Sequence, residues 1–248
     1  MLRSLTDILG YDILATDGEI GSVKDFYFDD ESWIVRYVVV DTGGWLRGRM
    51  VLLSPEAFGE PDWNTRLLPV DHTRQQIKDS PSVDTDRPVS RQQQVRLAAY
   101  FGWTPYWGAP GAPPEAYLPA ESEDAADQSK GDELDHGDRH LRSLKEVEGY
   151  RIDARDDRVG HVEDFIVQTD EWAIRYLVVD TRNWLPGRKV LVSPAWVDSV
   201  DWAQGLVHVD LDAETIRNSP EFDHTQPVNR EYEARLYDYY GRPEYWKT

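Results

Sequence analysis

The sequence predicts a mainly β protein made of two tandem small antiparallel β-barrels, each followed by a short helical and aromatic C-terminal extension. Two observations support this prediction. The chain repeats itself at a constant shift of 139 positions, and each copy holds several short strand-like segments separated by brief turns. A barrel is favoured over an open sheet because closure removes the unpaired edges through which sheets aggregate.

The repeat needs no gap anywhere. Residues Leu2–Leu5 match Leu141–Leu144, residues Val39–Thr42 match Val178–Thr181, and about 45 of the 106 aligned positions are identical. Such agreement indicates an internal duplication, so both copies are expected to adopt one fold.

Three regions follow from the repeat. Residues 1–108 are predicted to form the first barrel-like repeat, and residues 140–248 the second. Between them, residues 109–139 are rich first in Pro and Gly and then in Asp, Glu and Ser. Such a segment buries too little apolar surface to offset its ordering entropy, which predicts an acidic linker. The tethered repeats are expected to contact each other as an internal pseudo-dimer; independent domains are the alternative.

Each repeat is expected to contain strands and then helices. In the first repeat the strands are predicted at residues 10–15, 20–28, 33–40, 49–53 and 66–70. The third, Trp33–Val40, is apolar on both faces, which predicts a central, covered strand. Short helices are expected from His72 and from Ser90, where Gln93 completes a capping-box pattern. The aromatic tail that ends each repeat should be buried on a barrel, its own or, by exchange, the other one.

Several short motifs resemble those of the PRC-barrel family. They are Gly21-x-Val23-x-Asp25-Phe26, the Val-Val-Val-Asp strand, Arg49 to Ser54, Ser80-Pro81, and the ending Tyr239-Tyr240-Gly241 with Tyr245-Trp246, which is similar to the tail of a bacterial stand-alone branch. The family is shared by the cytoplasmic part of photosynthetic reaction-centre H subunits and the C-terminal half of a ribosome-maturation factor. The resemblance implies a binding and assembly module rather than an enzyme. It carries over neither a photosynthetic nor a ribosomal role, because the membrane helix and the RNA-processing domain of those relatives have no counterpart here.

Composition excludes several classes of partner. The formal net charge is −19, from 46 acidic and 27 basic residues, so the chain should repel nucleic acids and anionic membrane surfaces. It contains no cysteine, which excludes disulfides, thiolate catalysis and cysteine-bound zinc. No signal peptide or membrane-spanning run is evident, so we expect a cytoplasmic protein with no membrane insertion.

The sequence offers no catalytic, cofactor or metal site that we would select. His136 and His140 stand four residues apart, but they lie in or beside the predicted linker. The acidic turn Asp29–Glu31 could hold Ca²⁺ but lacks the ligand spacing of an EF-hand loop. We therefore expect no cofactor and no resident metal.

Two sets of residues are more informative. Charged residues that recur inside apolar strands are candidate structural ion pairs, because buried charges need partners: Asp25, Arg36, Asp41, Arg49, Asp164, Arg175, Asp180 and Arg188. A polar socket for a partner is the alternative reading. The candidate partner contacts are Trp45, Leu46, Trp184 and Leu185, because Trp is an anchor type at interfaces; a lid over the barrel is equally compatible.

The sequence thus favours a non-enzymatic binding or scaffold protein with protein partners, for which a stress-related role is one option. Two alternatives stay open: an acidic cation-binding protein, and an enzyme with a carboxylate site between the repeats. Clustered carboxylates with perturbed pKa values in a cleft would favour the enzyme.

Overall fold

The computed structural model describes residues 1–43, 49–85, 89–108, 137–181 and 188–247. The backbone forms two compact units. We call Leu9–Ser143 the N-unit, and Met1–Ile8 together with Leu144–Thr248 the C-unit. The division does not follow the repeat, because the first eight residues of the chain belong to the unit that holds most of the second copy.

The N-unit is built on a run of antiparallel strands. Its elements are β2 (Asp12–Ala15), β3 (Gly18–Asp29), β4 (Ile34–Asp41), β5 (Met50–Leu53), β6 (Leu67–Pro69), α1 (Arg74–Asp79), α2 (Arg91–Phe101) and β7 (Leu141–Ser143). Strand β3 pairs with β2 and β4, and β4 pairs with β5. The predicted strands are therefore present, and β4 is central as expected, with Val38, Val39 and Val40 all buried.

The C-unit repeats this plan. Its elements are β1 (Leu2–Ser4), α4 (Leu144–Val147), β8 (Arg151–Asp153), β9 (Arg158–Gln168), β10 (Ala173–Asp180), β11 (Lys189–Val192), β12 (Val197–Asp201), β13 (Leu206–Val209), α5 (Ala213–Asn218), α6 (Arg230–Tyr240) and a final 3-10 turn, Tyr245–Lys247. Strand β9 pairs antiparallel with β8 and β10, and β10 with β11.

The sheet of each unit is mixed, which corrects the expected purely antiparallel arrangement. Strand β6 runs parallel to β2, and β13 runs parallel to β8. The sequence pattern could not reveal this, because β6 reaches β2 only after the chain has passed through β3, β4 and β5, and no hairpin sets its direction. Among the described strands, no ladder joins β5 to β6, so the hydrogen-bonded ring stays open.

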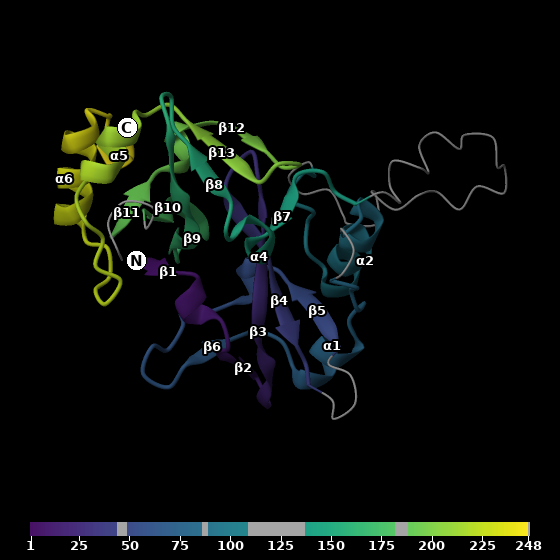
Figure 1. The fold of residues 1–248 in the computed structure, drawn as a ribbon. Helices are drawn as coiled ribbons and strands as arrows, with labels where there is room; N and C mark the ends of the chain where they lie inside the picture. The colour runs from purple at the N-terminus through teal and green to yellow at the C-terminus, as the bar shows by residue number, and fades with distance from the viewer. Residues whose placement is uncertain (44–48, 86–88, 109–136, 182–187, 248) are drawn as a thin grey trace, which may run out of the picture. The chain divides into compact units, whose positions relative to one another are not determined.

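Each unit receives one strand from the other repeat. Strand β1 opens the first repeat but pairs antiparallel with β9 of the second, with Ser4 opposite Ile166. Strand β7 opens the second repeat and pairs with β3 of the first, with Ser143 opposite Tyr27. Figure 1 shows the purple β1 beside the green β9. The two strands share the triplet Leu-Arg-Ser, so each fits the edge that the other uses.

An aspartate holds each exchanged strand. Asp25 accepts hydrogen bonds from the backbone N–H of Phe26 at 2.8 Å and from Ser143 Oγ on β7 at 2.5 Å. Asp164 accepts from Ser4 Oγ on β1, also at 2.5 Å. Burial raises the pKa of the Asp164 carboxyl, and its hydrogen bonds oppose that rise. These motif aspartates therefore serve strand docking.

The motif glycines allow a close approach of two strands. Gly21 has a φ of +66°, and a Cβ there would come well within 3.0 Å of the carbonyl oxygen of Asp41. Gly160 has a φ of +62° and stands in the same relation to Asp180. No other residue type combines this backbone with this clearance.

The helices and aromatic tails complete the two units. Helix α2 begins after the capping box of Ser90 and Gln93, as predicted. Apolar residues of β3 to β5 and α2 share one core in the N-unit, and Leu141 of β7 packs against it. Tyr106 and Trp107 are half-buried rather than fully buried, and Arg91 covers the Trp107 ring at 4.0 Å. The tail thus folds onto its own unit; the strands, not the tails, are exchanged.

Candidate binding site

The structure describes only one of the two predicted sets of site residues. The candidate partner contacts Trp45, Leu46, Trp184 and Leu185 lie outside the described residues. The candidate ion-pair residues are all described, and their contacts can be followed one by one.

The strand arginines contact groups from several neighbouring segments of the chain. Arg49 donates to the carbonyl oxygen of Ser80, just after α1, and Arg188 donates to that of Ser219, just after α5, at 2.5 Å. Arg36 donates to Ser32 Oγ at 3.1 Å and lies over the Tyr106 ring at 4.2 Å. Its counterpart Arg175 contacts Gln168, Glu171 and the Tyr245 ring.

The strand aspartates cap backbone groups or lie buried. Asp41 accepts from the backbone N–H of Gly43 at 3.0 Å. Its counterpart Asp180 is fully buried. Asp25 and Asp164 hold serine hydroxyls, and the pairing of the strand aspartates with the strand arginines stays a prediction.

The acidic turn that could have held Ca²⁺ is engaged by the chain itself. Asp29 accepts from the Ser32 hydroxyl and backbone N–H, both from its own turn. Asp30 lies 2.9 Å from His140 Nδ1 and 3.0 Å from Arg142 Nε. The hydrogen bond with Asp30 raises the pKa of the His140 imidazole. His136, the other member of the proposed histidine pair, lies outside the described residues.

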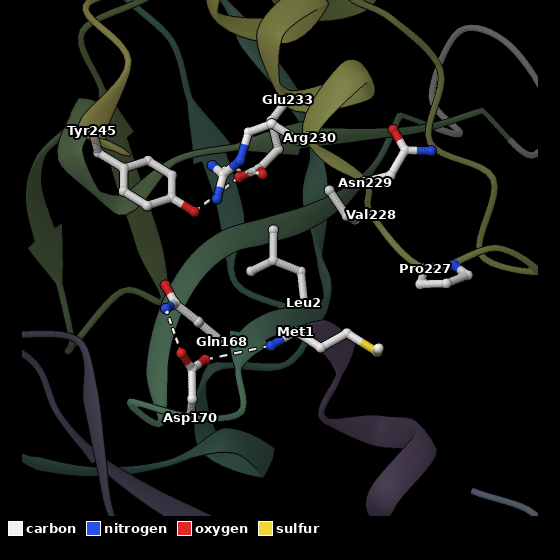
Figure 2. A pocket seen from close by; sticks show the side chains of 10 residues that line it. All are labelled: Met1, Leu2, Gln168, Asp170, Pro227, Val228, Asn229, Arg230, Glu233 and Tyr245. Carbon is white, nitrogen blue, oxygen red and sulfur yellow. Dashed lines mark hydrogen bonds and ion pairs between the residues drawn. The ribbon is translucent and has the colours of Figure 1, made fainter. Parts of the chain in front are cut away.

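The C-unit contains a pocket of about 420 Å³ beside the start of α6 (Figure 2). We call it the α6 pocket. It is lined by residues of β1, of the β9 end, of the segment that leads into α6, and of the aromatic tail: Met1, Leu2, Gln168, Asp170, Pro227, Val228, Asn229, Arg230, Glu233 and Tyr245. Leu2 and Val228 give it an apolar middle, and Asp170 lies at its rim, hydrogen-bonded to the Met1 amino group at 3.4 Å.

A buried carboxylate forms the inner end of the α6 pocket. Glu233 is 1% exposed and accepts hydrogen bonds from Tyr176 Oη at 2.7 Å and Tyr245 Oη at 2.9 Å. Arg230, one turn earlier on α6, pairs with its other oxygen at 2.9 Å. Burial is the largest cause that raises the pKa of Tyr245, to about 12, so both hydroxyls remain donors at neutral pH. The carboxylate is thus neutralised and fixed, as a buried charge requires.

The same place in the N-unit holds a segment of the chain. Gly137 forms an antiparallel bridge with Ser90, and the Asp138 N–H donates to the Val89 carbonyl oxygen at 2.8 Å. The Asp138 side chain, 2% exposed, accepts from Arg91 at 2.9 Å. Val89, Ser90 and Arg91 correspond to Val228, Asn229 and Arg230 at the 139-residue shift.

The α6 pocket and the equivalent place in the N-unit each contain a carboxylate, an arginine and tyrosines, but the carboxylate comes from a different part of the chain. In the N-unit the helix supplies Gln94, whose amide donates to Asp138 at 3.0 Å, and Tyr106 donates to the same oxygen at 3.0 Å. In the C-unit the helix itself supplies the carboxylate, Glu233. Each site therefore holds one carboxylate among an arginine and tyrosines, but only in the N-unit does an incoming segment bring it. No described residue bridges to Asn229 as Gly137 bridges to Ser90.

Sequence reasoning did not select Arg230, Glu233 or Tyr176. A signal was present: Arg91 and Arg230 recur at the first positions of α2 and α6, and a polar residue, Gln94 or Glu233, follows one turn later on the same face. A polar residue that recurs on an otherwise apolar helix face can mark a buried network.

Within the described part of the chain, no three His, Asp or Glu side chains are grouped so that they could bind a metal ion. None of its helices is both long and apolar enough to span a membrane.

Comparison with known proteins agrees with the repeat. The PRC-barrel domain model matches twice, at residues 2–76 and 142–216, and together these matches cover more than half of the chain. A search of curated proteins found no match. Helices α2 and α6 and both aromatic tails lie beyond the matched residues. The chain belongs to the PRC-barrel domain family, and it carries that domain twice.

Proposed function

We propose that this protein is a non-enzymatic binding module that takes hold of a partner protein through the α6 pocket. One observation carries the proposal: five residues that line this pocket correspond to residues that surround a segment of the chain in the N-unit. They are Val228, Asn229, Arg230, Glu233 and Tyr245. A site that packs around polypeptide in one repeat is suited to polypeptide in the other.

The contents of the pocket support binding over catalysis. Glu233 is held by two tyrosine hydroxyls and an arginine, and Asp170 by the Met1 amino group and Gln168. These partners favour a structural role for both carboxylates over the acid pair of a glycosidase. Its apolar middle and few fixed polar groups are typical of a recognition site. The engaged carboxylates of the Asp29–Asp30 turn likewise favour a binding module over the cation-binding alternative.

Selection from a displayed library of random linear peptides tests the proposal. We expect the purified chain to enrich peptides whose affinity falls at least about tenfold in the variant Pro227→Trp, in which a bulky ring enters the pocket from an exposed position. Asp238→Trp is the control, because Asp238 is exposed on α6 and does not line the pocket. Failure to enrich any peptide, or equal binding to both variants, would contradict the proposed function.

A further inference from the structure

We infer that the α6 pocket binds an extended peptide that runs antiparallel to Val228–Asn229 and presents an amide side chain, not a carboxylate, to Glu233. The inference rests on the proposed function and names the class of peptide. It comes from a comparison of equivalent places in the two units: the N-unit shows how polypeptide occupies this place, and the C-unit shows which group must change.

The backbone of the bound peptide is defined by the N-unit. There, Gly137 bridges to Ser90 and the next N–H donates to the carbonyl oxygen of Val89. In the C-unit, Val228 and Asn229 line the pocket at the matching positions. A peptide that follows the same course donates a main-chain N–H to the Val228 carbonyl oxygen, and such main-chain hydrogen bonds give affinity for extended peptides.

The side chain that the pocket should prefer in a bound peptide follows from the position of the carboxylate in each unit. Asp138 fits the N-unit because Arg91, Gln94 and Tyr106 all donate to it. In the C-unit the position of Gln94 is taken by Glu233, which already uses Arg230. A second carboxylate there would face the first with no cation of its own, which is costly away from water.

An asparagine in the bound peptide, at the position of Asp138, reverses the donor and the acceptor of the Gln94–Asp138 hydrogen bond of the N-unit. It has the shape of Asp138, carries no charge, and its NH₂ group can donate to the carboxylate of Glu233. A carboxylate accepts about four hydrogen bonds, and Glu233 receives three from the side chains of Tyr176, Tyr245 and Arg230. A small residue should precede the asparagine, as Gly137 precedes Asp138.

Two synthetic peptides test this inference. Both copy residues 133–139 with blocked ends and a fluorescent label, one with Asp138 retained and one with Asp138→Asn. Fluorescence anisotropy on the full chain should show the Asn peptide binding about tenfold more tightly than the Asp peptide. In the variant Glu233→Gln the order should reverse, because that pocket then carries the amide that Gln94 carries in the N-unit. The presence of Gln94 beside Tyr37 and Arg91 indicates that the fold accepts this change.

Pro227→Trp should abolish binding of both peptides, while Asp238→Trp should leave it unchanged. The inference is overturned if neither peptide binds at millimolar concentration, or if the preference is the same with Glu233 and with Gln. Peptides selected from the library that need the pocket but carry an acidic residue opposite Glu233 would overturn it too, and would leave the proposed function standing.

Discussion

Gly21 shows how one atom can limit the choice of residue. Its backbone is left-handed, and its missing Cβ leaves room for the Asp41 carbonyl oxygen on the neighbouring strand. Gly102 ends α2 with a similar φ of +77°, but nothing lies within 4 Å of the Cβ position there. The pair separates the cost of the conformation from the cost of the contact.

We expect Gly21→Ala to destabilise the N-unit by about 2–4 kcal/mol, because both costs apply. Gly102→Ala should cost about 1 kcal/mol, because only the conformational cost remains. Unfolding in urea, monitored by hydrogen exchange of the β3 amides, measures the loss of stability in both variants. Equal losses in the two variants would mean that the strands can separate to admit a methyl group.

His140 makes the stability of the N-unit depend on pH. Its hydrogen bond with Asp30 raises the pKa of the folded imidazole above the value near 6.5 of the unfolded chain. The protonated imidazole therefore stabilises the folded state fully below about pH 6.5, and this stabilisation is lost as the pH rises through the higher folded value. Because the side chain is about half exposed, the effect should stay below about 1 kcal/mol.

The free energy of unfolding, measured from pH 5.5 to 9 for the chain and for His140→Gln, tests this linkage. The difference between the two should be largest at the acidic end and shrink with rising pH. His72, whose pKa burial lowers, contributes equally to both proteins and cancels. A difference that grows with pH would show that the imidazole acts through another contact.

At the scale of elements, the two exchanged strands are the distinctive feature. Ser4 on β1 bonds to Asp164 on β9, and Ser143 on β7 bonds to Asp25 on β3. Each serine therefore stabilises a strand of the repeat to which it does not belong.

We expect Ser4→Ala to weaken protection from hydrogen exchange in β9, and Ser143→Ala to weaken it in β3, each by about 1–3 kcal/mol. The two variants are controls for each other. If Ser4→Ala loosened β3 and left β9 protected, β1 would dock in its own repeat in solution.

At the scale of the whole molecule, the exchange predicts the behaviour of a single repeat. A fragment of residues 1–108 keeps β3 but lacks β7, and it keeps β1 but lacks β9. Because β1 and β7 share the triplet Leu-Arg-Ser, we expect two fragments to exchange β1 reciprocally and form a homodimer, as in domain swapping.

Light scattering after size-exclusion chromatography measures the mass of the fragment. Asp25→Ala removes the acceptor for the serine hydroxyl and should raise the dissociation constant of the dimer about tenfold. A folded monomeric fragment at high concentration would show that β1 can turn back onto β3 of its own copy.

The sequence by itself determined the elements that local patterns encode. The repeat, the β-branched run that becomes β4, and the Ser90–Gln93 capping box depend on residues adjacent in the chain. The family motif around Asp25 could also be identified in the sequence. The resemblance did not reveal that Asp25 accepts a hydrogen bond from a serine of the exchanged strand β7.

Only the tertiary structure decided which copies of these elements meet. Two identical triplets can dock at either of two matching edges, and a repeated sequence carries no information that distinguishes them. The parallel pairing of β6 depends likewise on the path of the whole chain. The α6 pocket was hidden for a similar reason: Glu233 and Gln94 look like ordinary polar residues of a helix until the contacts of Tyr176 and Asp138 show that both are buried. Long-range contacts, and not local propensity, determine the strand partners and the candidate site.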